Sequence, residues 1–373
     1  MVSSPHSNSH SSPPRVLLIA LDGLGRSPLT YSAHTPFLSS LLSKGISFPS
    51  AHAVYPTDSA PNWGSILHGV LPEKHGLTNG DVESGKEFDE NSMYPSLFKI
   101  LVRRDEKEIS VRKKNEKYRH KIVIDNCRYG NKKTMMTNKD KVTRNASKFI
   151  TKPFICASNS RHPVCDEPIK YASFVAWAPI NTGIIERSIP GAFYSPKSES
   201  LCARIRLYVK HYILKSPSYD TYVLQRVLSF LSSPDSKDIE LLLVHFVDVD
   251  EQGHLYGFGS EKYLKQLRIL DGQVRTLFDE LEKDKWLEKM TVVITTDHGG
   301  TGTSHGEHSK DEMGSFVVVC GRGIQNKDIR SHEDEKTSKE DVRNMDCAAI
   351  VLAALGVDVP DWFDARIPKG IFE

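Results

Sequence analysis

Three short apolar runs constrain the fold of this 373-residue chain more than any other feature. They are VLLIAL (Val16 to Leu21), IELLLVHFV (Ile239 to Val247) and MTVVITT (Met290 to Thr296). Nearly continuous runs of this length are typical of parallel strands that helices cover on both faces. An aspartate follows each run at once or within three residues, so each predicted strand delivers a carboxylate at its C-terminal end.

Between the second and third runs the sequence predicts one long amphipathic helix. Apolar residues recur there at spacings of four and three: Tyr263, Leu267, Leu270, Val274, Leu277 and Leu281. This spacing places them on one face of a helix about 25 residues long. A strand, a helix and a second strand in this order indicate a βαβ unit, whose strands are parallel.

Further helices are predicted at residues 35–45, 61–69, 219–233 and 344–356, the first of them with Gly45 as C-cap. The predicted fold class is α/β, with a central, mainly parallel sheet sandwiched between helices. Ligands of such sheets bind beyond the carboxyl ends of the strands, where Asp22, Asp250 and Asp297 are expected.

Composition sets two segments apart from the rest of the chain. Residues 1–14, MVSSPHSNSHSSPP, have no apolar stretch and predict a disordered leader instead of a secretory signal. Between Leu101 and Lys170 there are 19 Lys and Arg residues against 8 Asp and Glu, a net charge of +11, although the whole chain carries only +2. We therefore predict a globular domain of residues 15–102 and 170–373 that is interrupted by a basic insertion, residues 103–169.

The basic insertion has three interpretations. It shows no sustained helix or strand period, which fits a lineage-specific loop without stable structure. Its composition also fits intron sequence retained in the gene model. As a third interpretation, its charge would tether an inactive scaffold to nucleic acid or to an acidic membrane. Its aromatic residues are sparse, so nucleic acid is not the expected partner.

Location is predicted only from what the sequence lacks. No run approaches the roughly 18 apolar residues that a membrane-spanning helix needs, so no transmembrane segment is expected. As written, the sequence predicts a cytoplasmic protein, and a secreted or organellar one if further sequence precedes it. The six cysteines form no CxxC pair, which argues against a structural zinc knuckle.

Four separated segments supply side chains suited to a metal site. They are LDG, TDSAP, DEQGH and TTDHGGTGTSHG, with the candidate residues Asp22, Ser59, Asp250, His254, Asp297, His298 and His305. A mixed set of Asp and His suits zinc or manganese, whereas calcium prefers oxygen ligands alone. Each residue alone has a structural interpretation; Ser59 before Pro61, for example, is a good helix N-cap. Three carboxylates at one sheet edge are harder to explain structurally.

The segments LIALDGLG, YPTDSAPNWGSILHGVLPEKHGL, HFVDVDEQGHLYG and TTDHGGTGTSHG together resemble the type I phosphodiesterase/nucleotide pyrophosphatase family of the alkaline phosphatase superfamily. The resemblance implies an alkaline phosphatase-like catalytic domain with two divalent metal ions at the strand ends. In this family the two ions are zinc. It implies one ion held by Asp22, Ser59, Asp297 and His298, and a second held by Asp250, His254 and His305.

The resemblance also assigns roles in the reaction. Ser59 would be the nucleophile and form a phosphoseryl intermediate, because a cation and a helix N-terminus both favour its alkoxide. Asn79 resembles the family asparagine that donates to a phosphoryl oxygen. His308 competes with His305 as the last metal ligand, and the sequence favours His305. Trp63 stands where sulfatases carry an arginine, which argues against sulfate esters as substrates.

The predicted function is therefore metal-dependent hydrolysis of phosphate esters, of the phosphodiesterase/nucleotide pyrophosphatase type. The expected partner is a small phosphate ester, either a nucleotide or a lipid head group. Serine in place of the threonine usual in the diesterases keeps a phosphomonoesterase as an alternative. A phosphoethanolamine-type phosphotransferase is another, because His305 follows the Asp297-His298 pair closely.

Overall fold

The computed structural model describes residues 13–111, 168–195, 218–324 and 341–372. A seven-stranded sheet forms its centre, in the order β2-β7-β6-β1-β5-β3-β4. Its strands are β1 (Val16–Leu21), β2 (Ile46–Phe48), β3 (Tyr171–Val175), β4 (Ala192–Tyr194), β5 (Leu241–Phe246), β6 (Thr291–Thr296) and β7 (Val317–Gly321).

The three apolar runs of the sequence are the three central strands. β1 lies between β5 and β6 and is parallel to both, with Leu21 opposite Phe246 and Thr296. β3 and β4 continue the parallel part of the sheet, while β7 is antiparallel to β6 and β2 is antiparallel to β7. The prediction of a mainly parallel sheet is confirmed.

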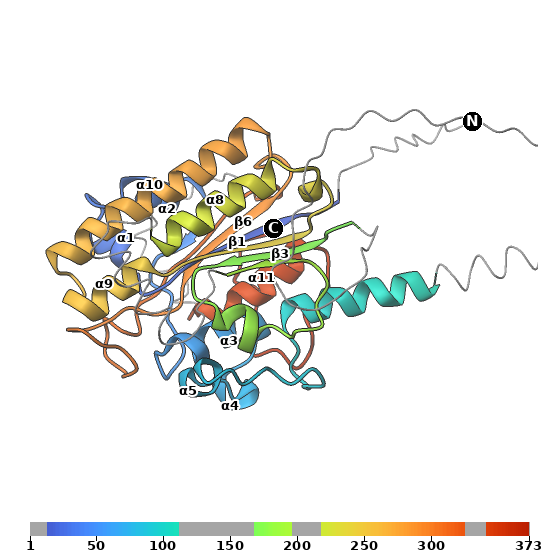
Figure 1. The fold of residues 1–373 in the computed structure, drawn as a ribbon, viewed down its shortest axis with the longest axis horizontal. Coiled ribbons are helices and arrows are strands. Elements are labelled where there is room, and N and C mark those ends of the chain that lie inside the picture. The colour runs from blue at the N-terminus through green and yellow to red at the C-terminus, as the bar shows by residue number, and fades with distance from the viewer. Residues whose placement is uncertain (1–12, 112–167, 196–217, 325–340, 373) are drawn as a thin grey trace, which may run out of the picture. The chain divides into compact units, whose positions relative to one another are not determined.

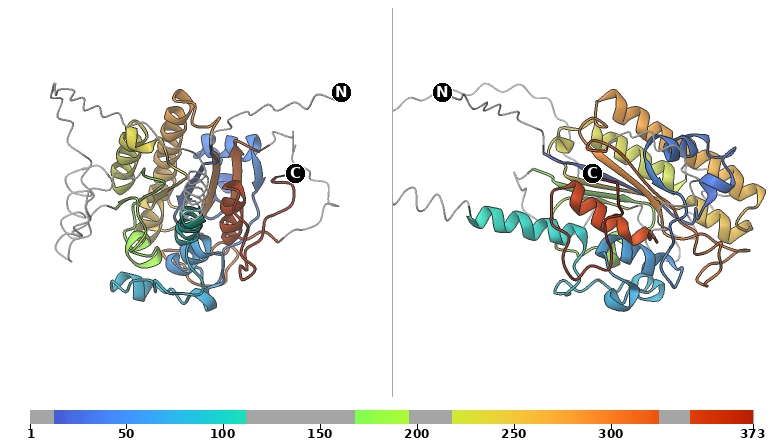
Figure 2. Two further views of the ribbon diagram at one scale, coloured as in Figure 1. Left: turned by 90° about the vertical axis from the view of Figure 1, so that its right-hand side faces the viewer. Right: turned by 180° about the vertical axis from the view of Figure 1, so that it is seen from behind.

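Helices cover both faces of the sheet (Figures 1 and 2). On one face lie α2 (Pro36–Lys44), α8 (Tyr219–Leu231), α9 (Asp248–Tyr256) and α10 (Glu261–Lys283). On the other lie α3 (Ser59–His68) and α11 (Cys347–Ala354). The shorter helical elements are α1 (Ser27–Thr30), α4 (Pro72–His75), α5 (Asn79–Glu83), a π-helix (Ile180–Ile184) and two 3₁₀ turns, Pro234–Ser236 and Asn344–Asp346.

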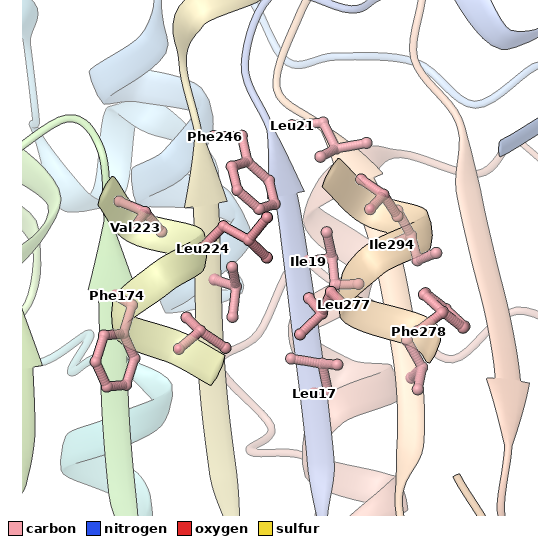
Figure 3. Packing of buried hydrophobic residues seen from close by; sticks show 14 of the residues in the cluster. Leu17, Ile19, Leu21, Phe174, Val223, Leu224, Phe246, Leu277, Phe278 and Ile294 are labelled. Atoms are coloured by element: carbon pink, nitrogen blue, oxygen red, sulfur yellow. The ribbon is translucent and has the colours of Figure 1, made fainter. Parts of the chain in front are cut away.

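The apolar stripe predicted for the long helix is the buried face of α10, which is 23 residues long. Its side chains pack with those of α8 against alternate residues of the central strands (Figure 3). Leu17, Ile19 and Leu21 of β1 point to this face and are fully buried. The strand–helix–strand unit is confirmed, but β1 lies between its two strands, so the connection crosses over β1.

The start of α3 differs from the prediction. The backbone N–H of Asn62 donates to the carbonyl of Asp58, so Asp58 occupies the N-cap position and Ser59 is the first helical residue. Interpreting Ser59 as an N-cap was therefore wrong, and its hydroxyl is not used for capping. Gly45 is the C-cap of α2 as predicted, although its backbone is extended and not left-handed.

The chain separates into two compact units, Met1–Lys99 with Arg161–Glu373, and Ile100–Ser160. Of the second unit the structure describes only residues 100–111, which are helical. The predicted leader and basic insertion lie outside the described residues except for 13–14, 103–111 and 168–169, so the domain boundaries stay a prediction. In the described parts of the chain, no helix is both long and apolar enough to span a bilayer.

Candidate functional site

The three predicted carboxylates meet at the C-terminal edge of the sheet. Asp22 follows β1 and Asp297 follows β6, and these two strands are paired in register. Asp250 lies in the first turn of α9, directly after β5. All three side chains are buried, with at most 6% of the residue exposed. Burying three carboxylates together is costly unless a positive charge balances them.

A first cluster contains four of the predicted residues, Asp22, Ser59, Asp297 and His298. The His298 Nε2 lies 3.1 Å from the Ser59 Oγ and 3.1 Å from the Asp297 Oδ2. It lies 3.8 Å from the Asp22 Oδ1. The ligand atoms of Asp22, Asp297 and His298 are all within 4.8 Å of one another, which is close enough to share one metal ion.

A second cluster contains the other three predicted residues, Asp250, His254 and His305. Asp250 and His254 are four residues apart on α9, and the His254 Nε2 lies 3.2 Å from the Asp250 Oδ2. The His305 Nε2 lies 3.0 Å from the His254 Nε2 and 3.8 Å from the Asp250 Oδ1. The rings of His305 and His298 stack with their centroids 3.8 Å apart, so the two clusters adjoin.

Backbone carbonyls orient the three histidines in the same way. The Nδ1 of His254 lies 3.0 Å from the carbonyl of Thr303, that of His298 lies 2.9 Å from Gly299, and that of His305 lies 2.9 Å from Thr57. A ring that donates its Nδ1–H to a carbonyl keeps an Nε2 lone pair for a metal, which is the usual second-shell arrangement of metal-ligating histidines.

The clusters fit divalent cations on two observations. Among the described residues, one oxygen each of Asp22, Asp250 and Asp297 is buried without a hydrogen-bond partner. Buried polar atoms are rarely left unpaired, so these oxygens need a ligand. In addition, the Nε2 atoms of His254 and His305 lie only 3.0 Å apart while the Nδ1 atoms of both rings face carbonyls, so the contact is favourable only with a proton or a cation at one of these Nε2 atoms.

The electrostatics of the site also favour bound cations. Burial, and after it the charge of Asp22, raises the pKa of Asp297 well above its usual value. Burial, followed by the charges of neighbouring carboxylates, raises the pKa of Glu251 to about 8. The hydrogen bond to Asp250 raises the pKa of His254 to about 9. The protein itself supplies too little positive charge for its carboxylates, and divalent cations would correct that imbalance.

Gly23 allows the first and second clusters to approach. Its φ of +67° lies in the left-handed region, and a Cβ at this position would be 2.5 Å from the Oδ1 of Asp250. Its backbone N–H donates to the Oδ1 of Asp297 at 3.1 Å. Only glycine can adopt this backbone conformation easily and also leave room for the Asp250 side chain.

The remaining predicted residues take clear positions. Asn79 begins α5, and its Oδ1 accepts the backbone N–H of Ala60 at 2.7 Å, so its amide lies at the N-terminus of α3. Among the described residues its Nδ2 has no partner. His308 is exposed and lies beside Tyr55, with ring centroids 5.7 Å apart. The structure therefore places His305, and not His308, beside Asp250.

Sequence reasoning missed two buried donors to Asp22. The Nε1 of Trp63 and the Nε2 of His245 lie 2.9 Å and 3.0 Å from the Asp22 Oδ2. Burial works to raise the pKa of Asp22, but the hydrogen bond from His245 and the nearby imidazoles lower it to about 2. A histidine inside an apolar strand is the one signal that could have indicated His245, and nothing in the sequence indicated that the Trp63 indole donates to Asp22.

The amino-acid sequence matches the model of the family described as type I phosphodiesterase / nucleotide pyrophosphatase over residues 16–350. The chain is 25% identical over 176 residues to a GPI ethanolamine phosphate transferase 1 from Aspergillus fumigatus, a match that covers 41% of this chain and 17% of the relative. It is 20% identical over 341 residues to ectonucleotide pyrophosphatase/phosphodiesterase family member 3 from Bos taurus, which covers 90% of this chain and 31% of the relative.

Solved structures share the fold. The murine ectonucleotide pyrophosphatase/phosphodiesterase 5 in complex with AMP superposes with a TM-score of 0.55 at 12% identity, covering 93% of this chain and 96% of the other. A putative sulfatase from Bacteroides thetaiotaomicron gives a TM-score of 0.58 at 12% identity, covering 95% and 73%. The predicted alkaline phosphatase-like fold is confirmed.

The match to the family extends from β1 to α11 and includes every residue of the two clusters. The chain spans less than a third of the length of the two curated relatives described above. The chain belongs to the type I phosphodiesterase/nucleotide pyrophosphatase family.

Proposed function

We propose that this chain is a metal-dependent phosphodiesterase that acts through a phosphoseryl intermediate on Ser59. The observation that carries the proposal is the arrangement of two adjoining clusters of metal-type ligands, one of them beside a serine, with three buried carboxylate oxygens that have no hydrogen-bond partner among the described residues. The Ser59 Oγ lies 3.1 Å from the His298 Nε2, and Ser59 is only 8% exposed. A buried serine with these neighbours is chemically suited to attack on phosphorus.

Two divalent cations are part of the proposal. One would be held by Asp22, Ser59, Asp297 and His298, and the other by Asp250, His254 and His305. The mixture of imidazole and carboxylate ligands favours zinc. When bound, the cations would neutralise phosphate charge and stabilise the entering and leaving oxygens of the substrate.

The side chains of this chain set up the reaction as follows. The Ser59 hydroxyl lies at the first turn of α3, where the partial positive charge of the helix N-terminus favours an anionic oxygen. As the bond from the Ser59 Oγ to phosphorus forms, the bond to the leaving oxygen breaks, and the Ser59 hydroxyl proton passes to the leaving oxygen or to solvent. The Nδ2 of Asn79 would donate to a phosphoryl oxygen while its Oδ1 keeps the hydrogen bond from the Ala60 N–H. Water then cleaves the phosphoseryl ester and restores Ser59.

A second candidate function is transfer of a phosphoethanolamine-type group to an alcohol. The similarity to GPI ethanolamine phosphate transferase 1 from Aspergillus fumigatus favours it, and similar matches come from other fungi. Hydrolysis and transfer share the first half of the reaction and differ only in whether water or an alcohol cleaves the intermediate. A phosphomonoesterase would form the same intermediate without the second ester group.

Hydrolysis of bis(p-nitrophenyl) phosphate and of p-nitrophenyl phosphate tests the proposal. We expect diester hydrolysis that is lost on chelation, restored by zinc and abolished in Ser59→Ala, with about two zinc ions per chain in the active protein. Diester hydrolysis that persists in Ser59→Ala would refute the role of Ser59.

Mass spectrometry of the peptide that contains Ser59 separates the candidates. A diester substrate should leave a p-nitrophenyl phosphate group on Ser59 after rapid quenching, whereas a monoester leaves a phosphoryl group. A phosphatidylethanolamine donor with a sugar alcohol as acceptor tests transfer directly. If the alcohol product forms faster than free phosphoethanolamine, the chain is a transferase.

A further inference from the structure

Two buried rings hold one oxygen of Asp22 from different parts of the chain. The indole of Trp63 comes from α3 and the imidazole of His245 from β5, and both side chains are essentially inaccessible to solvent. Their ring nitrogens lie 2.9 Å and 3.0 Å from the same atom, the Asp22 Oδ2. The rings meet edge to face, with centroids 5.1 Å apart and an interplanar angle of 83°. We call this pair, Trp63 and His245, the Asp22 clamp.

The clamp leaves the two carboxylate oxygens of Asp22 in different surroundings. A carboxylate oxygen has two lone pairs, and two N–H donors occupy both lone pairs of the Oδ2. The Oδ1 is buried and has no hydrogen-bond partner among the described residues, and it faces the Nε2 of His298 at 3.8 Å. The Nδ1 of His245 likewise has no partner in the described chain, so nothing but Asp22 selects the tautomer in which the Nε2 carries the proton. A cation in the first cluster would therefore meet a single oxygen of Asp22.

We infer that the Asp22 clamp restricts Asp22 to monodentate coordination and thereby selects a small, four-coordinate cation for the first cluster. This rests on the proposed role of Asp22 as a metal ligand. Zinc is satisfied by four ligands in a tetrahedral arrangement. Calcium takes six to eight oxygen ligands and uses carboxylates in both monodentate and bidentate modes. Because ring N–H groups occupy the Oδ2 of Asp22, Asp22 cannot offer the second carboxylate oxygen that a larger cation would use.

Substitutions that remove one N–H donor to Asp22, but leave an apolar side chain in its place, test the inference. Trp63→Phe keeps an aromatic ring but lacks the Nε1–H, and His245→Leu removes the imidazole donor. In both variants we expect zinc affinity at one of the two sites to fall by about 10- to 100-fold, the usual effect of losing a second-shell partner. We expect calcium affinity to stay level or to rise, so the ratio of the two affinities falls at least tenfold. His245→Gln, which keeps an N–H near the position of the Nε2, should restore most of the ratio.

Trp286→Phe is the matched control. Trp286 is also a buried tryptophan, but it packs under Arg15 and Lys289 and donates to no carboxylate of the described residues. Competition titrations of zinc and calcium with a chromophoric chelator should give the wild-type ratio for this variant. A wild-type ratio in folded Trp63→Phe and His245→Leu proteins would overturn the inference.

Asp22→Ala separates this result from the proposed function. If Asp22→Ala still binds two zinc ions with wild-type affinity, Asp22 is not a ligand and the proposed metal site fails. If Asp22→Ala loses one ion while both clamp variants keep the wild-type ratio, the metal site stands and only the selectivity inference fails.

Discussion

Asp220 and Asp248 accept hydrogen bonds from the first turns of each other's helices in the interior of the protein. The Asp220 Oδ1 accepts the backbone N–H of Val247 at 2.8 Å, and its Oδ2 accepts that of Asp248 at 3.2 Å. In return, the Asp248 Oδ2 accepts the N–H of Asp220 at 3.4 Å. α9 has Val247 at its N-cap, whose side chain offers no acceptor. Asp220 therefore replaces the missing cap on the helix that carries Asp250 and His254.

Replacement of Asp220 by alanine should destabilise the protein through α9. Two buried N–H groups would lose their acceptor, at a cost of about 1–3 kcal/mol in the free energy of unfolding. Asp220→Asn keeps one acceptor oxygen and should lose clearly less. Urea unfolding in the presence of chelator measures both variants without a contribution from metal. Equal losses in the two variants would show that the capping bonds are unimportant.

His305 and His308 should differ in their effect on metal content. His305 lies against Asp250 and His254, whereas the exposed His308 lies beside Tyr55. We expect His305→Ala to lose about one zinc ion per chain and His308→Ala to keep the wild-type content, as measured by elemental analysis after dialysis. The opposite result would exchange the assignments of the two histidines.

Gly23 should tolerate alanine much less than Gly76 does. Both have a φ of +67°, but a Cβ at Gly76 meets no atom within 4 Å while one at Gly23 lies 2.5 Å from the Asp250 Oδ1. Gly76→Ala should therefore show only the backbone strain, about 1 kcal/mol. Gly23→Ala should lose a further 1–3 kcal/mol, roughly the cost of overpacking, and bind the second metal ion more weakly. Thermal unfolding with and without zinc tests this, and similar melting temperatures in the two variants would contradict it.

Stability should fall below pH 6.5 because of His75. Burial, and after it the charge of His68, lowers the pKa of His75 to about 3, and the Nδ1 of His75 accepts the N–H of Leu77 at 3.0 Å. Above pH 6.5 the ring is neutral in both the folded and unfolded states. As the pH falls from 6.5 towards 3, the unfolded state gains a proton that the folded state resists, so stability is lost.

At pH 5 the loss assigned to His75 is about 2 kcal/mol, because each pKa unit corresponds to roughly 1.4 kcal/mol. In His75→Gln the free energy of unfolding should change less between pH 8 and pH 5, by about that amount. Urea unfolding of metal-free protein measures it, with His308→Gln as an exposed control. An unchanged pH dependence in His75→Gln would exclude this residue as the cause.

Asn79→Asp should separate the two roles of Asn79. The carboxylate keeps the acceptor for the N–H of Ala60, which lies 2.7 Å from the Oδ1, but it removes the Nδ2 donor. If Asn79 donates to a phosphoryl oxygen, kcat should fall by about 10²- to 10³-fold in both Asn79→Asp and Asn79→Ala. Stability should fall mainly in Asn79→Ala. A kcat within a few-fold of wild type in Asn79→Ala would remove Asn79 from the reaction.

The sequence by itself determined the central strands and the chemical types gathered at their ends. Buried parallel strands are continuous apolar runs, so β1, β5 and β6 could be recognised from short windows. The carboxyl ends of parallel strands share one edge of a sheet, so Asp22, Asp250 and Asp297 could be expected together. The helical spacing of apolar residues predicted α10 from the sequence, because that spacing repeats within the helix itself.

Only the tertiary structure decided the order of the strands and the partners of the site residues. β1 lies between β5 and β6, Asp58 occupies the N-cap position of α3, and the indole of Trp63 donates to Asp22. The hydrogen bond between His245 and Asp22 joins residues 223 positions apart. Such contacts depend on how whole elements pack, and packing at long range leaves no period or spacing in the sequence from which it could be read.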